Sequence, residues 1–199
     1  MGPRSHDDAG QAFPIYIMVV AGLLFLAFAY LAVGQAAANR NGAQTAADAA
    51  ALAAALDTRD KLTDEWVQNV LDPTKWKDIF NGVGTVFDGC ARASQLAAQN
   101  DATVLSCGAT QGLYPGYAVD AKTNKAIGDS IVPGVEGKQS IQSATAVIEP
   151  ACEFKLPGAD ADADVLPELT CEDGNWTLDP SDLTDLPGPE DLFDVHLAD

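Results

Sequence analysis

One long uncharged segment dominates the hydropathy pattern of the first forty residues. It runs from Ala9 to Asn39, and its apolar centre, Phe13 to Val33, contains a single proline, Pro14. A helix of these apolar residues, at 1.5 Å per residue, is about 31 Å long, which matches the hydrocarbon core of a bilayer. We therefore predict a transmembrane helix at residues 13–33, preceded by a short cytoplasmic N-terminus at residues 1–12.

Three interpretations of this helix stay open. A cleaved secretory signal needs a basic N-terminal region and a short apolar run. Here Arg4 is the only basic residue before a longer run, although Ala36 to Ala38 resembles a cleavage site. The other two interpretations are a permanent single-pass anchor and a pilin-type helix. A pilin-type helix is first a membrane anchor and later a packing element of an assembly.

The helix is expected to continue beyond the membrane, because alanine dominates the next segment. No proline occurs between Pro14 and Pro73, and alanine has the highest helix propensity. We predict a helix from about Pro14 to Asp57, of which residues 34–57 project from the membrane. Asn39 to Gly42 is the point where a kink or break is expected.

Small side chains repeat at helical spacing along this projecting helix. Small residues at such spacing let helix backbones approach closely. They pack either on the protein's own domain or on a helix of another subunit. We expect replacement of Ala47, Ala50 and Ala54 with Leu to disrupt assembly more than folding, because it would prevent close approach of the helices. The repeating alanines are Ala43, Ala46, Ala47, Ala50, Ala51, Ala54 and Ala55.

Residues 58–157 are expected to form a small extracellular α+β domain. Thr63 is a plausible N-cap for a short helix over residues 63–71, which Asp72-Pro73 would end. The apolar segment 76–87 contains Gly82 and Gly84, which disfavour a regular helix. A further helix is predicted at residues 90–100, and strands at residues 102–107, 117–120 and 140–148. Trp66, Trp76, Phe80 and Phe87 are expected in the core or in a hydrophobic patch against a partner.

The acidic composition excludes several classes of function. The net charge is −18, and residues 153–199 hold fourteen acidic residues but only one lysine. Nucleic-acid binding and tight docking on anionic lipid both need clustered Lys and Arg, so neither is expected. Residues 158–199 are rich in Asp, Pro and Gly, and we expect this region to be irregular and partly disordered.

Cysteine usage points to an oxidising compartment. All four cysteines follow the predicted anchor, and their spacings of 17, 45 and 19 residues lack the paired steps of a zinc site. Disulfides explain this pattern best and support a domain outside the cytoplasm. Three pairings are available, and we expect the sequential one, Cys90 with Cys107 and Cys152 with Cys171.

Two stretches around the apolar run resemble a known family. Residues 10–16 read GQAFPIY, and residues 40–55 read RNGAQTAADAAALAAA. Together they resemble the N-terminal module of TadE/TadG-like proteins of the tight-adherence (Tad, or Flp) pilus systems, over about residues 10–57. The resemblance implies a pilin-like membrane protein with its C-terminal domain outside the cytoplasm. Its partners would be the lipid bilayer, other pilus or assembly-machine subunits and a surface target.

The resemblance also suggests a processing position. Flp-type prepilins resemble G-x-x-x-x-E-Y around their cleavage point, so Gly10 is the candidate. Ile15 stands where the family has the glutamate that is important for processing. TadG-like proteins commonly keep their N-terminus, and the sequence fits them better.

No catalytic constellation is present in the sequence. The two histidines, His6 and His196, lie at opposite ends, and no phosphate-binding loop occurs. Asp160, Asp162 and Asp164 resemble the start of a calcium loop, but Val165 stands where its glycine should be, and a solvated acidic loop is the simpler interpretation. We expect a non-catalytic structural protein without a cofactor. The alternative is a monomeric membrane-tethered receptor that binds its ligand with or without calcium.

Overall fold

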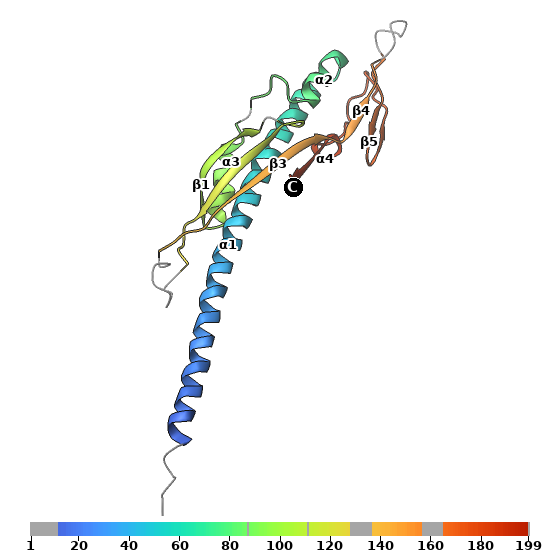
Figure 1. Cartoon of the computed structure of the whole chain (residues 1–199). Helices are drawn as coiled ribbons and strands as arrows, with labels where there is room; N and C mark the ends of the chain where they lie inside the picture. Colours follow the sequence, from blue (N-terminus) through green and yellow to red (C-terminus); the bar gives the residue numbers. More distant parts are fainter. Residues whose placement is uncertain (1–11, 87, 111, 128–136, 157–164, 199) are drawn as a thin grey trace, which may run out of the picture.

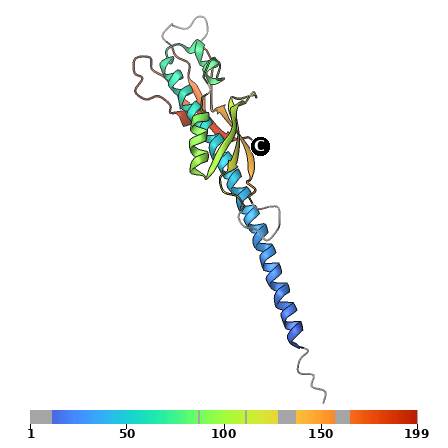
Figure 2. The same cartoon turned by 90° about the vertical axis from the view of Figure 1, so that its left-hand side faces the viewer.

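The computed structural model of the chain is a long helical rod with an α+β domain folded around its second half (Figure 1). It describes residues 12–86, 88–110, 112–127, 137–156 and 165–198. The predicted α+β class, with a long N-terminal apolar helix, antiparallel strands and two disulfides, is confirmed. The first half of the rod stands clear of the domain in both views (Figure 2).

One helix, α1, runs without interruption from Ala12 to Gln68. The expected break at Asn39 to Gly42 is absent, because helix-favouring alanines flank these residues on both sides. The separate helix predicted to start at Thr63 is also wrong. Thr63 lies inside α1, where its hydroxyl donates to the carbonyl of Arg59 at 3.1 Å, a bond typical of a helix interior.

Two short helices follow α1. Helix α2 (Pro73–Phe80) starts with proline in its first turn and ends before Gly82, whose φ is +65°. The apolar segment predicted to reach residue 87 is therefore helical only as far as Phe80, and Phe87 lies outside the described residues. Helix α3 (Cys90–Gln99) agrees with the prediction and ends at the turn of Asn100 and Asp101.

An antiparallel sheet covers one side of the domain half of α1. Its strands are β1 (Ala102–Thr110), β2 (Gly116–Thr123), β3 (Ile141–Pro150) and β7 (Phe193–Leu197), in the order β1-β2-β3-β7. Alternate residues of β2 and β3 are buried toward α1, as the period of two requires. The sheet-side core residues are Tyr117, Val119, Ala121, Ala144, Ala146 and Ile148.

The acidic C-terminal region is far more ordered than its composition predicts. It forms β5 (Leu169–Cys171) and β6 (Gly174–Trp176), which pair with β4 (Cys152–Phe154), and then α4 (Pro189–Leu192) and β7. Strand β7 pairs antiparallel with β3, so Phe193 is opposite Pro150. Residues 165–168 and 177–188 are irregular, as expected, whereas the strands and α4 were not expected. They form because apolar side chains of this region, such as Leu169, Leu192 and Phe193, are buried in the core.

Aromatic rings close the end of the domain farthest from the apolar half of α1. Ring centroids are 5.4 Å apart for Trp66 and Trp76 and 5.3 Å apart for Trp76 and Phe154. Phe80 contacts both Phe154 and Phe193, at 5.6 and 5.3 Å. The expectation that Trp66, Trp76 and Phe80 belong to the core is confirmed. The cluster joins α1, α2, β4 and β7, which are distant in the sequence.

Both disulfides follow the sequential pairing expected from the sequence. Cys90–Cys107 joins the first residue of α3 to β1, with Cα atoms 5.8 Å apart. Cys152–Cys171 joins residues that face each other on β4 and β5. Each bridge closes a loop of fewer than twenty residues, for which the entropy model gives about 3 kcal/mol of stabilisation.

Candidate membrane anchor and its junction with the domain

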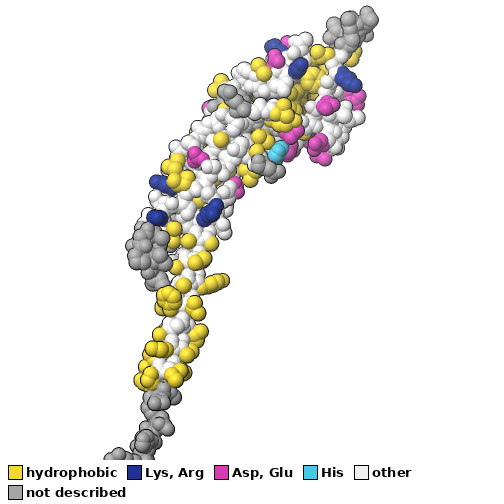
Figure 3. Space-filling view, in the orientation of Figure 1, with side chains coloured by type: hydrophobic (Ala, Val, Ile, Leu, Met, Phe, Trp, Pro, Cys, Tyr) yellow, Lys and Arg dark blue, Asp and Glu magenta, His cyan; other side chains and the backbone are white. Residues whose placement is uncertain are grey.

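The first half of α1 exposes a continuous apolar surface. Its most apolar window has a mean hydropathy of 2.5 and none of it is buried within the described structure. Met18 is 78% exposed and Tyr30 is 83% exposed. Figure 3 displays this surface as a rod of hydrophobic side chains. By length and composition the helix is able to cross a membrane, and a water-exposed rod of this kind would be costly.

The second half of α1 has the opposite environment, because its small residues are buried. Ala47, Ala50 and Ala54 have no exposed surface, and α1 contacts α3, β2 and β3 at this level. Their small size brings α3 close to α1. A Cβ atom added to Gly89, which precedes α3, would lie 2.4 Å from the carbonyl oxygen of Ala54.

This burial favours the first interpretation of the alanine face, packing on the protein's own domain. The effect of Leu at Ala47, Ala50 and Ala54 on assembly and on folding stays a prediction. In the structure the face is occupied by the chain's own α3 and sheet, so larger side chains there would disrupt the domain itself.

Asn39 marks the junction between the two halves of α1. Its side-chain amide donates to the carbonyl of Lys125 at 2.9 Å. Its amide oxygen accepts from the Thr123 hydroxyl at 3.2 Å and from the backbone N–H of Ser140 at 3.1 Å. One side chain therefore holds the ends of β2 and β3 at a fixed level on α1, six residues beyond Val33.

A shallow charged hollow lies between α1 and α3. It has a volume of about 810 Å³ and is lined by Leu52, Leu56 and Leu96 together with charged groups. Lys61 forms ion pairs with Asp57, at 2.7 Å, and with Asp88. These hydrogen bonds raise the pKa of Lys61 and lower that of Asp88. The pairs join α1 to the segment that leads into α3, so they support the domain.

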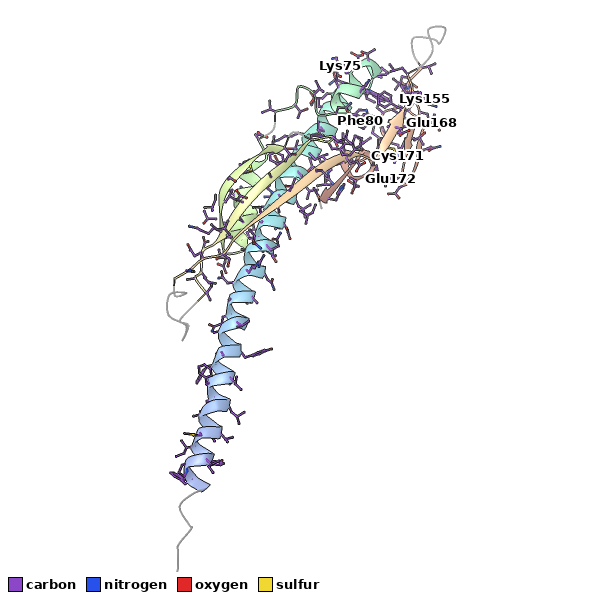
Figure 4. The ribbon with its side chains drawn as sticks, in the orientation of Figure 1. Lys75, Phe80, Lys155, Glu168, Cys171 and Glu172 are labelled. Atoms are coloured by element: carbon purple, nitrogen blue, oxygen red, sulfur yellow. A yellow bond between two sulfur atoms is a disulfide. The ribbon has the colours of Figure 1, made fainter. Side chains whose placement is uncertain are left out.

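A second hollow, of about 530 Å³, lies at the far end of the domain between α2 and β4. Apolar Phe80, Phe154 and Leu156 line it together with Lys77 and Lys155. Figure 4 labels Lys75 and Phe80 on the α2 side, and Lys155, Glu168 and Glu172 on the side of β4 and β5. The distal end of the domain therefore combines apolar and cationic side chains with the carboxylates of Glu153, Glu168 and Glu172.

The predicted calcium and processing residues lie outside the part of the chain that the structure describes. Asp160, Asp162 and Asp164, the calcium candidates, and Gly10, the processing candidate, lie outside the described residues. Among the residues that are described, no group of three or more His, Cys, Asp or Glu side chains is arranged to hold a metal ion. His196 lies on β7, where its Nδ1 is 2.8 Å from a carboxylate oxygen of Asp194.

Sequence reasoning missed the residues that connect the rod to the domain. The sequence marks Asn39 only as a weak point of the helix and gives Gly89 no special role. No local signal identifies either residue, because their partners are 84 to 101 residues away for Asn39 and in a different helix for Gly89.

Comparison with known proteins gives one finding. Residues 10–57 match the family of Flp pilus-assembly TadE/G-like proteins, which covers the apolar half of α1 and most of its buried alanine face. No curated protein and no solved structure matches the chain. The long apolar helix and the family match together indicate a single-pass membrane protein. Residues 10–57, about a quarter of this chain, are therefore similar to the putative TadE/G-like segment of Flp pilus assembly.

Proposed function

We propose that this protein is a structural, non-catalytic and pilin-like component of a Tad/Flp-type pilus or surface-adhesion system. The observation that carries the proposal is the double role of α1. One uninterrupted helix has an exposed apolar half, and its other half is the centre of a folded domain. This construction transmits force between a bilayer and a domain, because the helix has no hinge between them.

The proposed orientation puts the N-terminus in the cytoplasm and the domain outside the cell membrane. Two disulfides within the domain support this orientation, since disulfides persist in oxidising compartments and are rare in the cytosol. The proposed partners are the lipid bilayer and other subunits of the assembly machine, with a surface target for the distal end of the domain.

Intact mass of the mature protein, measured without reduction in membrane and sheared-surface fractions, tests this function. A chain that retains residues 1–10 and stays in the membrane supports an anchored TadG-like accessory protein. A chain that starts at Gln11 and appears in sheared material supports a processed pilin-type subunit. A chain that begins near Ala38 would contradict the anchor, because the apolar half of α1 would then be a cleaved signal.

A matched pair of variants tests the anchor directly. Leu24→Arg places a charge in the exposed apolar half of α1, and Leu71→Arg places it at an exposed leucine beyond α1. A charge near the centre of a spanning helix costs roughly 3 kcal/mol on insertion scales. We expect Leu24→Arg to reduce retention of the protein in alkali-washed membranes and Leu71→Arg to leave it unchanged. Equal retention of both variants would contradict a spanning role for α1.

A membrane-tethered receptor is the second candidate. The hollow between α2 and β4 favours it, because apolar Phe80 and Phe154 share its lining with Lys77 and Lys155. A receptor would remain monomeric and would not associate with filaments, which the sheared-surface fraction measures. Its calcium-dependent form predicts that a chelator lowers the melting temperature of the protein, whereas unchanged melting would contradict it.

A further inference from the structure

Four cations gather at the end of the domain that is nearest to the apolar half of α1. Arg40 follows Asn39 on α1, and Lys122 lies at the end of β2. Lys125 follows the end of β2 and Lys138 precedes the start of β3, and the N–H of Ile127 donates to the carbonyl of Lys138. Figure 3 displays Lys and Arg side chains where the domain meets the apolar rod. The chain has only eleven Lys and Arg residues, so this basal group holds a large share of them.

Asn39 sets the height of this basal group above the membrane. It lies six residues beyond Val33, which corresponds to about 9 Å along a helix. The headgroup region adds roughly 5–7 Å to each side of the hydrocarbon core. Because Asn39 binds the carbonyl of Lys125 and the N–H of Ser140, the ends of β2 and β3 lie at the same height. Flexible lysine side chains at this height reach the phosphate layer.

The acidic groups that face these cations offset only part of their charge. Lys125 forms an ion pair of 2.8 Å with Asp101. With the Gln142 amide assigned in the orientation that satisfies its hydrogen bonds, the Nε–H of Arg40 donates to its oxygen at 3.1 Å. Within the described residues, Arg40, Lys122 and Lys138 form no ion pair. Residues 128–136, which come between β2 and β3 in the sequence, contain Asp129 and Glu136 and lie outside the described residues.

We propose that Arg40, Lys122, Lys125 and Lys138 form a cationic collar that binds the phosphate groups of anionic phospholipids at the surface of the membrane that α1 spans. This proposal revises the expectation, drawn from the net charge of −18, that the protein does not dock on anionic lipid. Net charge does not reveal a local cluster of cations, and about half of the acidic residues lie in the last quarter of the chain. The collar would hold the base of the sheet against the bilayer and direct the acidic distal end away from it. Each cation near an anionic surface strengthens binding about fivefold, so the effect depends on local rather than total charge.

This inference rests on the proposed membrane-spanning role of α1, and its test separates the two. The full chain is placed in nanodiscs of phosphatidylcholine alone or with one part in three of phosphatidylglycerol. Retention in the discs reports on the anchor. Backbone hydrogen exchange of residues 122–127 and 137–142 reports on the collar. We expect slower exchange of both segments in the anionic discs, and loss of this protection at high salt.

Two charge-matched variants complete the test. The collar variant carries Arg40→Gln, Lys122→Gln and Lys138→Gln, and leaves the ion pair of Lys125 intact. The control variant carries Lys77→Gln, Arg92→Gln and Lys155→Gln, all exposed and remote from the junction. We expect the collar variant to lose the lipid-dependent protection and the control to keep it, with equal retention of both variants in the discs.

Three results would overturn the collar. The first is equal exchange in the two lipid compositions, and the second is equal protection of the two variants. The third is protection of the detergent-solubilised protein by inorganic phosphate, which would indicate a soluble-anion site instead of a lipid surface. Loss of the chain from the discs would overturn the anchor as well, so failure of the collar and failure of the anchor are distinguishable.

Discussion

The hydroxyl oxygens of Thr58 and Tyr117 lie 3.0 Å apart in the buried core, where α1 meets the sheet. The Tyr117 oxygen also accepts the backbone N–H of Gly89 at 2.9 Å. Three elements, α1, β2 and the residue before α3, thus meet at one phenol. Because buried polar groups must be paired, this contact fixes the position of α3 as well as its distance from α1.

Tyr117→Phe removes the phenol oxygen and leaves the Gly89 N–H without this acceptor. An unsatisfied buried group costs about 1–3 kcal/mol, so we expect the free energy of unfolding to fall by that amount. Urea denaturation of the full chain in detergent, followed by tryptophan fluorescence, measures it. Tyr114→Phe is the control, because the Tyr114 hydroxyl lies outside the buried core and solvent screens its hydrogen bond to the Glu149 carboxylate, so stability should change less than in Tyr117→Phe. Equal effects of the two substitutions would contradict this role of Tyr117.

Gly89→Ala should separate α3 from α1. The added Cβ would lie 2.4 Å from the backbone oxygen of Ala54, and a backbone atom in a helix does not move aside easily. Overpacking of this kind typically costs about 1–3 kcal/mol. Gly108→Ala is the matched control, because a Cβ on Gly108 meets nothing within 4 Å. Thermal unfolding of both variants measures the difference, and similar melting temperatures would show that α3 has room to shift.

Ala50→Leu should destabilise the domain even in the isolated protein. Ala50 has no exposed surface within the chain, so three additional carbon atoms have no space. Ala37→Leu adds the same atoms to an exposed position of α1 and should have little effect on folding. Unfolding in detergent compares the two variants. A folded, equally stable Ala50→Leu protein that fails only in assembly would restore the interpretation of this face as a subunit contact.

Asp120 should make the stability of the sheet sensitive to acid. The Ser106 hydroxyl and then the Ser143 hydroxyl donate to its carboxylate, at 2.6 and 2.5 Å, and hold its pKa below the ordinary value. A carboxyl whose pKa is lower in the folded state stabilises that state above its unfolded pKa of about 4. This contribution is lost as the pH falls through the folded pKa.

The double substitution Ser106→Ala with Ser143→Ala should raise the pKa of Asp120 toward the ordinary value. We expect it to lower stability at neutral pH and to have a smaller effect below pH of about 4. Carbon-detected NMR titration of the Asp120 carboxyl measures the shift directly. Ser94→Ala is the control, because the Ser94 hydroxyl donates to the carbonyl of Cys90 and contacts no carboxylate. A pKa that stays low in the double variant would contradict the hydroxyl contribution.

Local sequence patterns determine the rod, the class of the fold and the bridges. The apolar run of residues 13–33 and the alanines that follow it have one strong local preference, so they specify a helix without reference to any partner. Cysteine count and spacing likewise favoured two bridges, both present in the structure. Helix α3 and strands β1, β2 and β3 were placed to within a few residues, because each has its own period and turn residues.

Only the tertiary structure decided how these elements are used. The alanine face of α1 packs against the chain's own α3 and sheet. This packing depends on Gly89 and Tyr117, which are distant from the alanines in the sequence. The acidic tail is ordered because β7 pairs with β3, a contact between residues about fifty positions apart that composition cannot reveal. Asn39 links the two halves of α1 to the sheet because the fold brings Thr123, Lys125 and Ser140 within hydrogen-bonding distance of its side chain. Propensity acts between neighbours in the chain, whereas burial and long-range hydrogen bonds depend on which segments meet in space.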